Sequence, residues 1–502
     1  MQLENLLGVM MNKTHIRKSC LAVAGALVFG FAGNAMAETT EDIINALVSK
    51  GVLTEEEGDL LAKGRKTEKA ATEEKSRKAW YNHINIRGYV QNRHTTMLGG
   101  DEGVNLWTDR SVGSDKSLGS DAPNNFLIRR ARIIFSGQVG DHLGFYIQPD
   151  FASSAGTTGN IAQLRDAYGD IFIDKDQVHR FRVGQSKVPY GFENLQSSSN
   201  RLALDRVDAM NSAVRDERDT GVFYYYTPKD VQALFNEINK LGLKHSGNYG
   251  MFALGAHQGQ GANRAERNDT YHWVSRFTYP WKVESGQIFE AGIQAYKGKF
   301  VSSTGRYNAT GGDVASSFSN LKSSGTNPNT GSSTNFTQSK ATAIPFIDSD
   351  YKNGIDDERI GVSFMMYPQP FGLEAEWNWG STPGLDMETN TITKKSLNGG
   401  YIQTMYKKDN VNFLGYDIGT LIPFVKWQYF DGYNKAETNS PRNQVNDWEF
   451  GTEWQIAPEV ELVAVYHRMH RNNLVTGNTS GRPDYERFEA QALRVQLQYN
   501  FF

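Results

Sequence analysis

The sequence lacks three features that define many proteins of its length. Only one cysteine, Cys20, occurs among the 502 residues, and it precedes an apolar segment near the N-terminus, so the rest of the chain has neither disulfides nor thiol chemistry. No long apolar run follows that segment, and the mean hydropathy of −0.54 argues against a helical membrane protein. The formal net charge of −3 is near neutral and does not indicate nucleic-acid binding.

Glycine and aromatic residues are abundant for such a polar chain. The sequence has 49 glycines, 23 tyrosines and 27 phenylalanines. Short strands, tight turns and rings of aromatic side chains at a membrane surface would together explain that excess. A membrane β-barrel needs no apolar 20-residue run, because only every second residue of a strand meets lipid.

The N-terminus has the pattern of a secretory signal peptide. Basic residues at positions 13, 17 and 18 precede a short apolar region over 21–32. Ala35-Met36-Ala37 then forms a small-residue cleavage site, which would leave Glu38 as the first mature residue. The apolar run is too short for a transmembrane helix, which is the alternative interpretation. We therefore predict a signal peptide over residues 1–37.

Residues 38–79 differ in composition from everything that follows. Residues 41–48 and 54–62 are each amphipathic and predict two short helices. Thr54 followed by Glu57 forms a capping box that would begin the second helix. We predict a periplasmic helical and linker extension that supports trimer assembly or contacts the cell wall; a partly disordered spacer is an equal alternative.

From Asn82 onward the hydrophobic pattern has a period of two. Segments of this kind recur to the C-terminus and number about sixteen, an even number as in bacterial barrels. A soluble β-sandwich or propeller would share the period but rarely places aromatic residues at strand ends. The aromatic residues expected at the membrane surface include Trp80-Tyr81, Tyr279, Trp281, Trp377, Trp379, Trp448, Trp454 and 499–502. The prediction is an all-β, transmembrane antiparallel β-barrel over residues 80–502.

The predicted connections alternate between short and long. Gly140-Asp141 and Ala457-Pro458 are tight turns, whereas 188–218 and 300–357 are long, the latter rich in Gly, Ser, Thr and Asn. Short periplasmic turns opposite long outer loops are typical of these barrels. Residues 229–243 break the pattern, because their apolar spacing predicts a helix where a turn is expected, which we interpret as a periplasmic insertion.

Three stretches resemble the phosphate-selective porin O and P family. They are Leu127–Gly137 with its arginines, the hairpin formed by Phe145–Phe151 and Leu164–Tyr168, and Arg182–Glu193, which continues into 194–205. The resemblance extends over residues 80–502 and is sharpest from 127 to 222. It implies a sixteen-stranded, homotrimeric outer-membrane channel with an inward-folded third loop at 188–218.

Strand alternation places several arginines inside the barrel. With Leu127, Ala131, Ile133 and Phe135 facing lipid, Arg130 and Arg132 face the lumen. Strict alternation would put Arg129 into lipid, which is costly near mid-bilayer, so Arg129 must lie at a rim or a bulge. By the same argument Arg87, Arg93, Arg182, Arg276 and Arg494 are luminal. The residues predicted to bind anions in the pore are Arg129, Arg130, Arg132, Arg182, Arg201, Arg206 and Lys187.

The function implied by the resemblance is passive diffusion of small hydrophilic solutes, with anions such as phosphate preferred. The chain departs from the family's phosphate channels, which carry lysines in the third loop where this sequence has Asn194 and Ser199. Luminal carboxylates are also predicted, at Asp150, Asp166, Asp170, Glu374, Glu376, Glu449 and Glu453. A general diffusion porin without phosphate selectivity therefore remains open, and any single arginine is more often paired structurally with a carboxylate than used for a solute.

Other functions have little support in the sequence. No Gly-x-Ser-x-Gly motif occurs, and His467 and His470 have no serine companion, so we do not expect an enzyme. Adhesion or phage reception by the long loops is a secondary possibility. No cofactor or metal site is predicted; the expected partners are small solutes and outer-membrane lipid.

The last strand gives a register for the C-terminus. Val495, Leu497, Tyr499 and Phe501 form an outward set, while Arg494, Gln496, Gln498 and Asn500 point inward. The outward register ends on Phe501, so we predict that Phe501, and not Phe502, belongs to the aromatic ring at the membrane surface.

Overall fold

The structure is a computed structural model. It describes residues 44, 48, 54, 56, 57, 59–61, 63, 83–101, 104, 106, 109, 124–155, 158–305, 324–326, 333–335, 345–347, 351, 353–475 and 484–501. The chain divides into two compact units, residues 1–83 and residues 84–502. The predicted signal peptide, the pair Trp80-Tyr81, Phe502 and most of the long 300–357 connection lie outside the described residues.

The N-terminal unit contains the predicted capping box. The backbone N–H of Thr54 donates to Glu57 Oε2 over 2.9 Å, and the N–H of Glu57 donates back to Thr54 Oγ1 over 3.3 Å. Residues 56, 57, 59–61 and 63 are helical. These hydrogen bonds lower the pKa of the exposed Glu57 carboxyl. The capping box is confirmed because it satisfies two N–H groups that a helix start leaves free.

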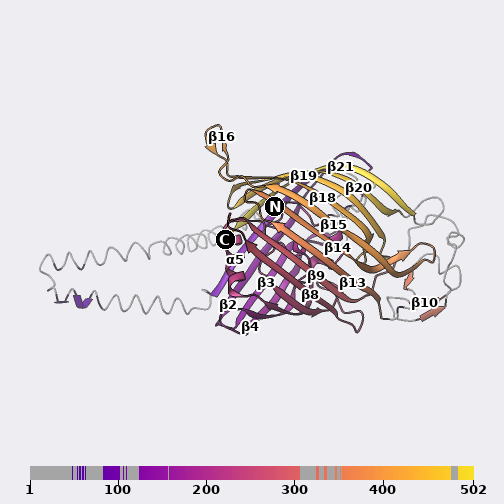
Figure 1. Cartoon of the computed structure of the whole chain (residues 1–502), viewed down its shortest axis with the longest axis horizontal. Coiled ribbons are helices and arrows are strands. Elements are labelled where there is room, and N and C mark those ends of the chain that lie inside the picture. The colour runs from indigo at the N-terminus through magenta and orange to yellow at the C-terminus, as the bar shows by residue number, and fades with distance from the viewer. Residues whose placement is uncertain are drawn as a thin grey trace, which may run out of the picture. The chain divides into compact units, whose positions relative to one another are not determined.

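The second unit is a closed barrel of sixteen antiparallel strands, as predicted (Figure 1). Each strand pairs with its neighbours in the sequence, and β1 pairs with β21 to close the sheet, with Gly88 opposite Phe501. The barrel strands are β1 (Ile84–Gly100), β2 (Asn124–Val139), β3 (Leu143–Ala155), β4 (Thr158–Phe172), β5 (His179–Lys187), β6 (Arg218–Tyr226), β7 (Phe252–His257), β8 (His272–Lys282), β9 (Ile288–Phe300), β13 (Ile355–Met366), β14 (Phe371–Asp386), β15 (Thr391–Tyr406), β18 (Thr420–Tyr433), β19 (Arg442–Ala457), β20 (Val460–Val475) and β21 (Asp484–Phe501).

The two ends of the barrel differ. The short-turn end carries the connections β2–β3, β4–β5, β8–β9 and β19–β20, together with the start of β1 and the end of β21. The opposite, long-loop end carries β10 (Ser324–Thr326), β11 (Ser333–Asn335) and β12 (Phe346–Ile347) within the β9–β13 connection. A small hairpin of β16 (Asn412–Phe413) and β17 (Tyr416–Asp417) projects at the short-turn end. None of the helices in the described part of the chain is long and apolar enough to cross a membrane.

The strands present an apolar outer face and a largely polar inner face. On β21, Leu497 and Tyr499 are 39% and 41% exposed, whereas Arg494 and Gln496 are 1% and 4% exposed. The predicted register of the last strand is therefore confirmed. Several aromatic residues expected at the membrane surface are exposed on the outer wall, namely Tyr279, Trp379, Trp448 and Tyr499. Alternation of this kind is what a barrel in lipid requires when its interior holds water.

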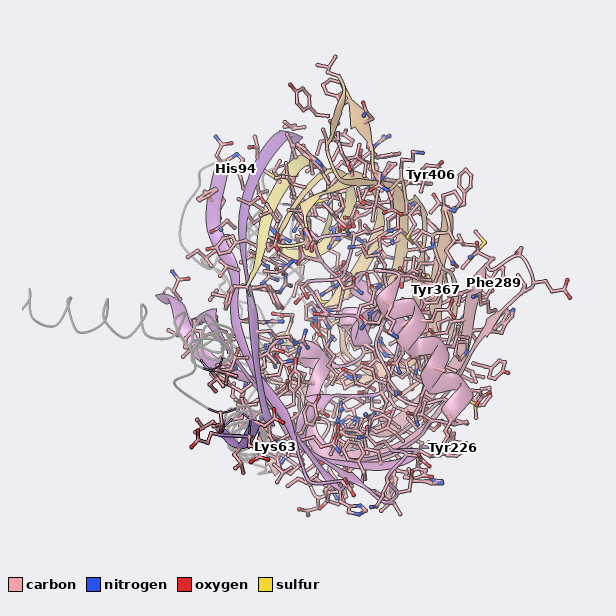
Figure 2. All side chains as sticks on the ribbon, turned by 90° about the vertical axis from the view of Figure 1, so that its left-hand side faces the viewer. Lys63, His94, Tyr226, Phe289, Tyr367 and Tyr406 are labelled. Atoms are coloured by element: carbon pink, nitrogen blue, oxygen red, sulfur yellow. The ribbon has the colours of Figure 1, made fainter. Side chains whose placement is uncertain are left out.

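Helix α5 (Lys229–Lys240) confirms the helix predicted between β6 and β7. It ends three residues before the predicted boundary, and it is more than an insertion beside the barrel. Val231, Phe235 and Ile238 are buried in one cluster with residues from the inner faces of the barrel strands. Figure 2 looks onto the short-turn end and shows the helix lying across the barrel opening.

Candidate functional site in the barrel interior

A β-bulge on β2 lets two consecutive arginines, Arg129 and Arg130, face the lumen. Gln91 on β1 pairs with Arg130, and the next residue, Asn92, pairs with Ile128, so Arg129 is the extra residue. Of the two positions predicted for Arg129, a rim or a bulge, the structure has the bulge, which lets both Arg129 and Arg130 reach the interior. It also corrects the predicted faces before the bulge, because Phe126 and Ile128 are the exposed residues there and Leu127 is only partly exposed.

The connection between β5 and β6 lies inside the barrel. It contains α3 (Phe192–Leu195), α4 (Asp208–Asn211) and the single turn η2 (Arg215–Glu217). Because Arg218 begins β6, the third loop is one residue shorter than predicted and spans residues 188–217. Both flanking strands have only nine residues, so the chain leaves the wall early. Along most of its length the third loop is buried.

The third loop contacts opposite sides of the barrel wall. On one side, the N–H groups of Phe192 and Glu193 donate to Glu376 on β14 over 2.8 and 3.1 Å. On the other side, Gln91 on β1 donates to the carbonyl of Ser198 over 2.9 Å. Because these contacts join distant strands, the loop crosses the lumen.

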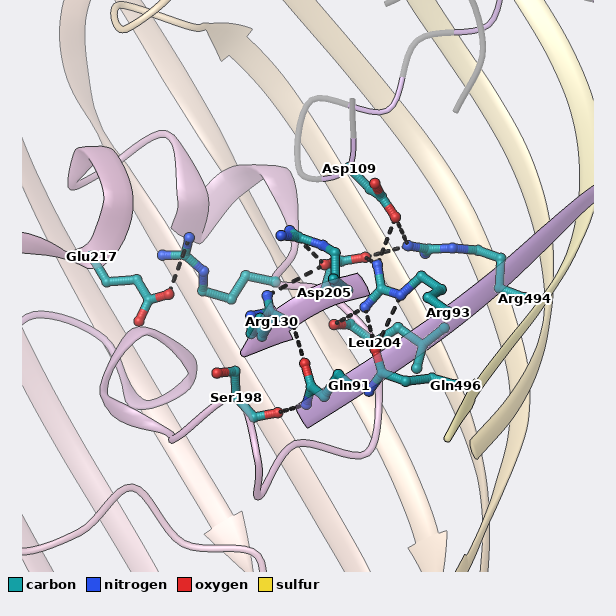
Figure 3. Close-up of polar contacts among 12 residues, drawn as sticks. Gln91, Arg93, Asp109, Arg130, Ser198, Leu204, Asp205, Glu217, Arg494 and Gln496 are labelled. Atoms are coloured by element: carbon teal, nitrogen blue, oxygen red, sulfur yellow. Dashed lines mark hydrogen bonds and ion pairs between the residues drawn. The ribbon is translucent and has the colours of Figure 1, made fainter. Parts of the chain in front are cut away.

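Asp205 in the third loop is the centre of a buried arginine cluster (Figure 3). Arg93 Nη1 lies 2.8 Å from Asp205 Oδ2, and Arg129 and Arg130 lie 3.3 and 3.7 Å from Oδ1. Arg494 on β21 also donates to this carboxylate. Asp109, from the β1–β2 connection, accepts hydrogen bonds from Arg93 over 2.6 Å and from Arg494 over 2.9 Å.

The cluster fixes the charge of Asp205. Burial by itself would raise the pKa of this carboxyl, but Arg93, Arg494, Arg129 and Arg130 outweigh burial and hold the pKa well below its usual range. Four guanidinium groups face two carboxylates here, so the cluster has an excess of positive charge. The third loop is thereby bound to β1, β2 and β21.

A second basic cluster surrounds Glu217 at the end of the third loop. Lys187 and Arg206 each lie 3.3 Å from its carboxylate, and Arg218 donates to it over 3.0 Å. Lys187 also donates to the carbonyls of Leu195 and Gln196 over 3.1 and 2.5 Å. Lys187 and Arg206, two of the predicted anion-binding residues, are thus used to hold the loop in place.

Two further predicted residues form ion pairs along the wall. Arg132 donates to Asp150 over 2.7 Å. Arg182 forms a bidentate pair with Asp170, with distances of 2.8 and 2.9 Å. Both arginines are therefore paired with carboxylates, which is one of the two roles that the sequence left open for each arginine. Charge-assisted bidentate pairs such as that of Arg182 are strong.

Arg201 differs from the other predicted residues. Its side chain is only 7% exposed, yet none of its three guanidinium nitrogens has a hydrogen-bond partner among the residues that the structure describes. It lies within electrostatic range of Arg130 on the basic wall and of Glu374 on the opposite wall. An anionic group would satisfy the five unused donors of this buried guanidinium.

The opposite wall is acidic. Glu374 and Glu376 on β14 are buried there, as their predicted faces require, whereas the buried Glu449 lies on β19, near Arg494 of the arginine cluster. Lys426 on β18 forms an ion pair with Glu193 of the third loop. Within the described ranges, no group of His, Cys, Asp and Glu side chains is arranged to hold a metal ion.

The family model described as phosphate-selective porin O and P matches residues 103–501. The chain belongs to this family. It is therefore an outer-membrane porin, a channel formed by the barrel described above. No curated protein matches the sequence.

Solved structures of outer-membrane barrels are similar to this porin. The outer membrane channel DcaP of Acinetobacter baumannii is 13% identical, with 83% of this chain and 97% of that chain covered and a TM-score of 0.46. OmpF of Salmonella typhi, in complex with daunomycin, is 11% identical, with 84% and 99% covered and a TM-score of 0.45. An anion-selective porin from Comamonas acidovorans is 10% identical, with 83% and 99% covered and a TM-score of 0.42.

Two features of the lumen of this porin do not follow from strand alternation. Alternation along strands does not place Asp109 in the lumen, because Asp109 lies in a long connection far from Arg494 in the sequence. The inner wall near the short-turn end is apolar, although a polar lumen was predicted. An apolar inner wall is indicated by runs such as Ile422-Pro423-Phe424-Val425. A strand that is apolar on both faces must be covered on both faces.

Proposed function

We propose that this porin prefers anions such as phosphate and that the third loop forms the narrowest part of the pore. The observation that carries the preference is Arg201, whose guanidinium is buried in the third loop and has no partner in the described part of the chain. Its nitrogens have no exposed surface in the structure, so an anion reaches them by moving the side chains that cover them, and it then accepts hydrogen bonds without displacing a carboxylate. Bidentate binding of phosphate oxygens is the chemistry that a free guanidinium supports.

The charge of the neighbouring wall favours the same preference. Arg93, Arg129, Arg130 and Arg494 outnumber the carboxylates of Asp109 and Asp205. Ion pairing therefore leaves a net positive charge beside the path. Fixed positive charge in a lumen of low dielectric raises the local concentration of anions.

The alternative is a general diffusion porin without phosphate selectivity. Glu374 and Glu376 on the opposite wall favour it, because basic and acidic walls that face each other create a field across the pore. Such a field orients polar solutes and does not itself select an anion.

Reversal potentials in a salt gradient test the preference. In planar bilayers, we expect the wild-type porin to be anion-selective and Arg201→Gln to lower the anion-to-cation permeability ratio by about threefold or more, as loss of one desolvated charge implies. Arg487→Gln is the matched control, because Arg487 is 67% exposed and pairs with Glu489 at the long-loop end. A cation-selective wild type, or equal effects of the two substitutions, would refute the proposal.

Added phosphate separates the two candidate functions. If phosphate binds at Arg201, it reduces the chloride current of the wild type and has a weaker effect on Arg201→Gln. A chloride current that does not respond to phosphate would favour the general diffusion porin.

We also infer the maturation and assembly of the chain from its sequence and family. Residues 1–37 are removed as a signal peptide, residues 38–79 form a periplasmic extension near the cell wall, and the barrel assembles as a homotrimer. Intact-mass measurement of protein extracted from outer membranes is expected to give a chain that begins at Glu38. A mass that retains residues 13–37 would contradict the cleavage site.

A further inference from the structure

The connection between β6 and β7 is unlike the other connections at the short-turn end. It spans residues 227–251 and contains α5, whereas β19 and β20 are joined there by two residues. We call residues 227–251 the insertion. Its first part is anchored at the rim, where Lys229 pairs with Asp176 over 2.7 Å and Glu237 with Lys282 over 2.6 Å.

The apolar face of the insertion is packed against the inside of the barrel. Val231, Phe235, Ile238 and Leu243 are buried in a single cluster. The cluster's other members include residues on β13, β15, β18 and β20, namely Met365, Met405, Ile422, Phe424, Val463 and Val465.

Strand alternation shows that these partners lie on the inner face. Phe364 and Val425, next to Met365 and Phe424 in the sequence, are each 36% exposed and point to the outside. The apolar inner wall at this end is therefore covered by α5, and burial of this apolar surface stabilises the helix in the opening.

The segment after α5 continues across the interior to the far wall and to the third loop. Lys244 forms a buried ion pair with Glu453 on β19, with a distance of 2.5 Å. Gln196 donates to the carbonyl of Lys244 over 3.4 Å, and Asn200 donates to the carbonyl of His245 over 3.1 Å. The insertion and the third loop thus contact each other inside the barrel.

A cavity of about 620 Å³ remains between these elements and the basic wall. The insertion lines it with His245, Ser246 and Tyr249, and the third loop lines it with residues 197–200. Arg87 and Tyr146 are among the residues of the opposite side. The cavity lies next to the start of β1 and the end of β21, and therefore at the short-turn end.

We propose that the insertion forms a second narrowing of the pore, on the periplasmic side of the third loop, and that Ser246 and Tyr249 help to determine the size of solute that passes. The solute moves through the cavity beside the basic wall, because α5 and Lys244 fill the side next to β13–β20. The insertion would thus select solutes by size, because its shape sets the width of the path. This role does not depend on the ion preference proposed above.

Cysteine chemistry provides a sharp test, because the chain's only cysteine, Cys20, precedes the proposed cleavage site. In Ser246→Cys, a methanethiosulfonate reagent added from the periplasmic side is expected to reduce single-channel conductance by about half or more, and a bulkier reagent to reduce it further, since the added group narrows a limiting section. Ala233→Cys is the matched control, because Ala233 is exposed on α5 and does not line the cavity.

Mass spectrometry establishes whether each introduced thiol has reacted. Reaction at Ser246→Cys with unchanged conductance would overturn the proposal, because the insertion would then not limit the current. Failure of the reagent to reach this thiol would also overturn it, because a position on the solute path must be accessible. Equal loss of conductance in Ala233→Cys would assign the effect to the rim and not to the cavity.

Discussion

Asp205→Asn is expected to lower the free energy of unfolding of the barrel by about 3 to 5 kcal/mol, the range seen when one partner of a buried ion pair is removed. Four guanidinium groups contact this carboxylate, and Asp109 is the remaining carboxylate in the cluster. The substitution keeps the size of the side chain, so the effect is one of charge. Urea unfolding in lipid vesicles, followed by tryptophan fluorescence, measures it.

Asp431→Asn is the control for this substitution. Asp431 pairs with Arg442 over 3.0 Å, but the two side chains are 30% and 41% exposed. An exposed pair contributes about 0 to 1 kcal/mol, so little stability should be lost. If the two substitutions cost the same, the arginines around Asp205 must find other partners, such as Gln91 and Gln496, which already accept hydrogen bonds from Arg130 and Arg93.

The same substitution should change the channel. Loss of the carboxylate leaves the cluster more positive and removes one attachment of the third loop to β1 and β21. Other attachments remain, among them Asp208 with Arg471 over 2.9 Å and the donation from Arg359 to Ala209 over 3.0 Å. We therefore expect the current to become more anion-selective and noisier. The third loop should stay in the lumen, so the conductance should not rise to that of a barrel without the loop.

The features of the fold that depend on local alternation were predictable from the sequence. A period of two sets which residues face lipid, and the high cost of an arginine in lipid predicts a rim or a bulge at Arg129, where the structure has a bulge. The capping box at Thr54 and Glu57 is likewise a local signal. In each case, the prediction depends on residues close together in the sequence, and the same residues form the structural feature.

The partners of the luminal charges could not be predicted in this way. Asp205 and Arg494 are 289 positions apart, and only the closed barrel brings them together. The sequence gives the types of charge on each face but not which arginine is left over once the pairs have formed. That Arg201, and not Arg132 or Arg182, lacks a partner in the described residues follows from how the third loop crosses the lumen.

The insertion was recognisable as a helix but not as part of the lumen. Its apolar spacing predicts α5, yet the surface that covers this face comes from strands β13 to β20, more than 100 positions later. The sequence does contain a corresponding pattern, because the ends of those strands are apolar on both the outer and the inner face. Two unexplained apolar surfaces in one barrel are evidence that each covers the other.

Gly88→Leu is expected to reduce the fraction of folded barrel in outer membranes severely. Gly88 lies opposite Phe501 where β1 and β21 close the sheet. A Cβ atom at this position would lie 2.4 Å from the Phe501 ring and 2.4 Å from the carbonyl oxygen of Arg132. The ring thus packs over a glycine, an arrangement that stabilises paired strands. Heat-modifiable migration of unboiled samples on gels measures the folded fraction.

Gly99→Leu on the same strand is the matched control, because a Cβ atom at Gly99 would have no neighbour within 4 Å. Over-packing of a fitted position costs about 1 to 3 kcal/mol, and here the cost falls on the last pairing step that closes the barrel. Equal folded fractions for the two variants would show that the ring can move aside. In that case Phe501 would serve only as a membrane-surface residue, whereas the packing against Gly88 assigns it a second role in closing the barrel.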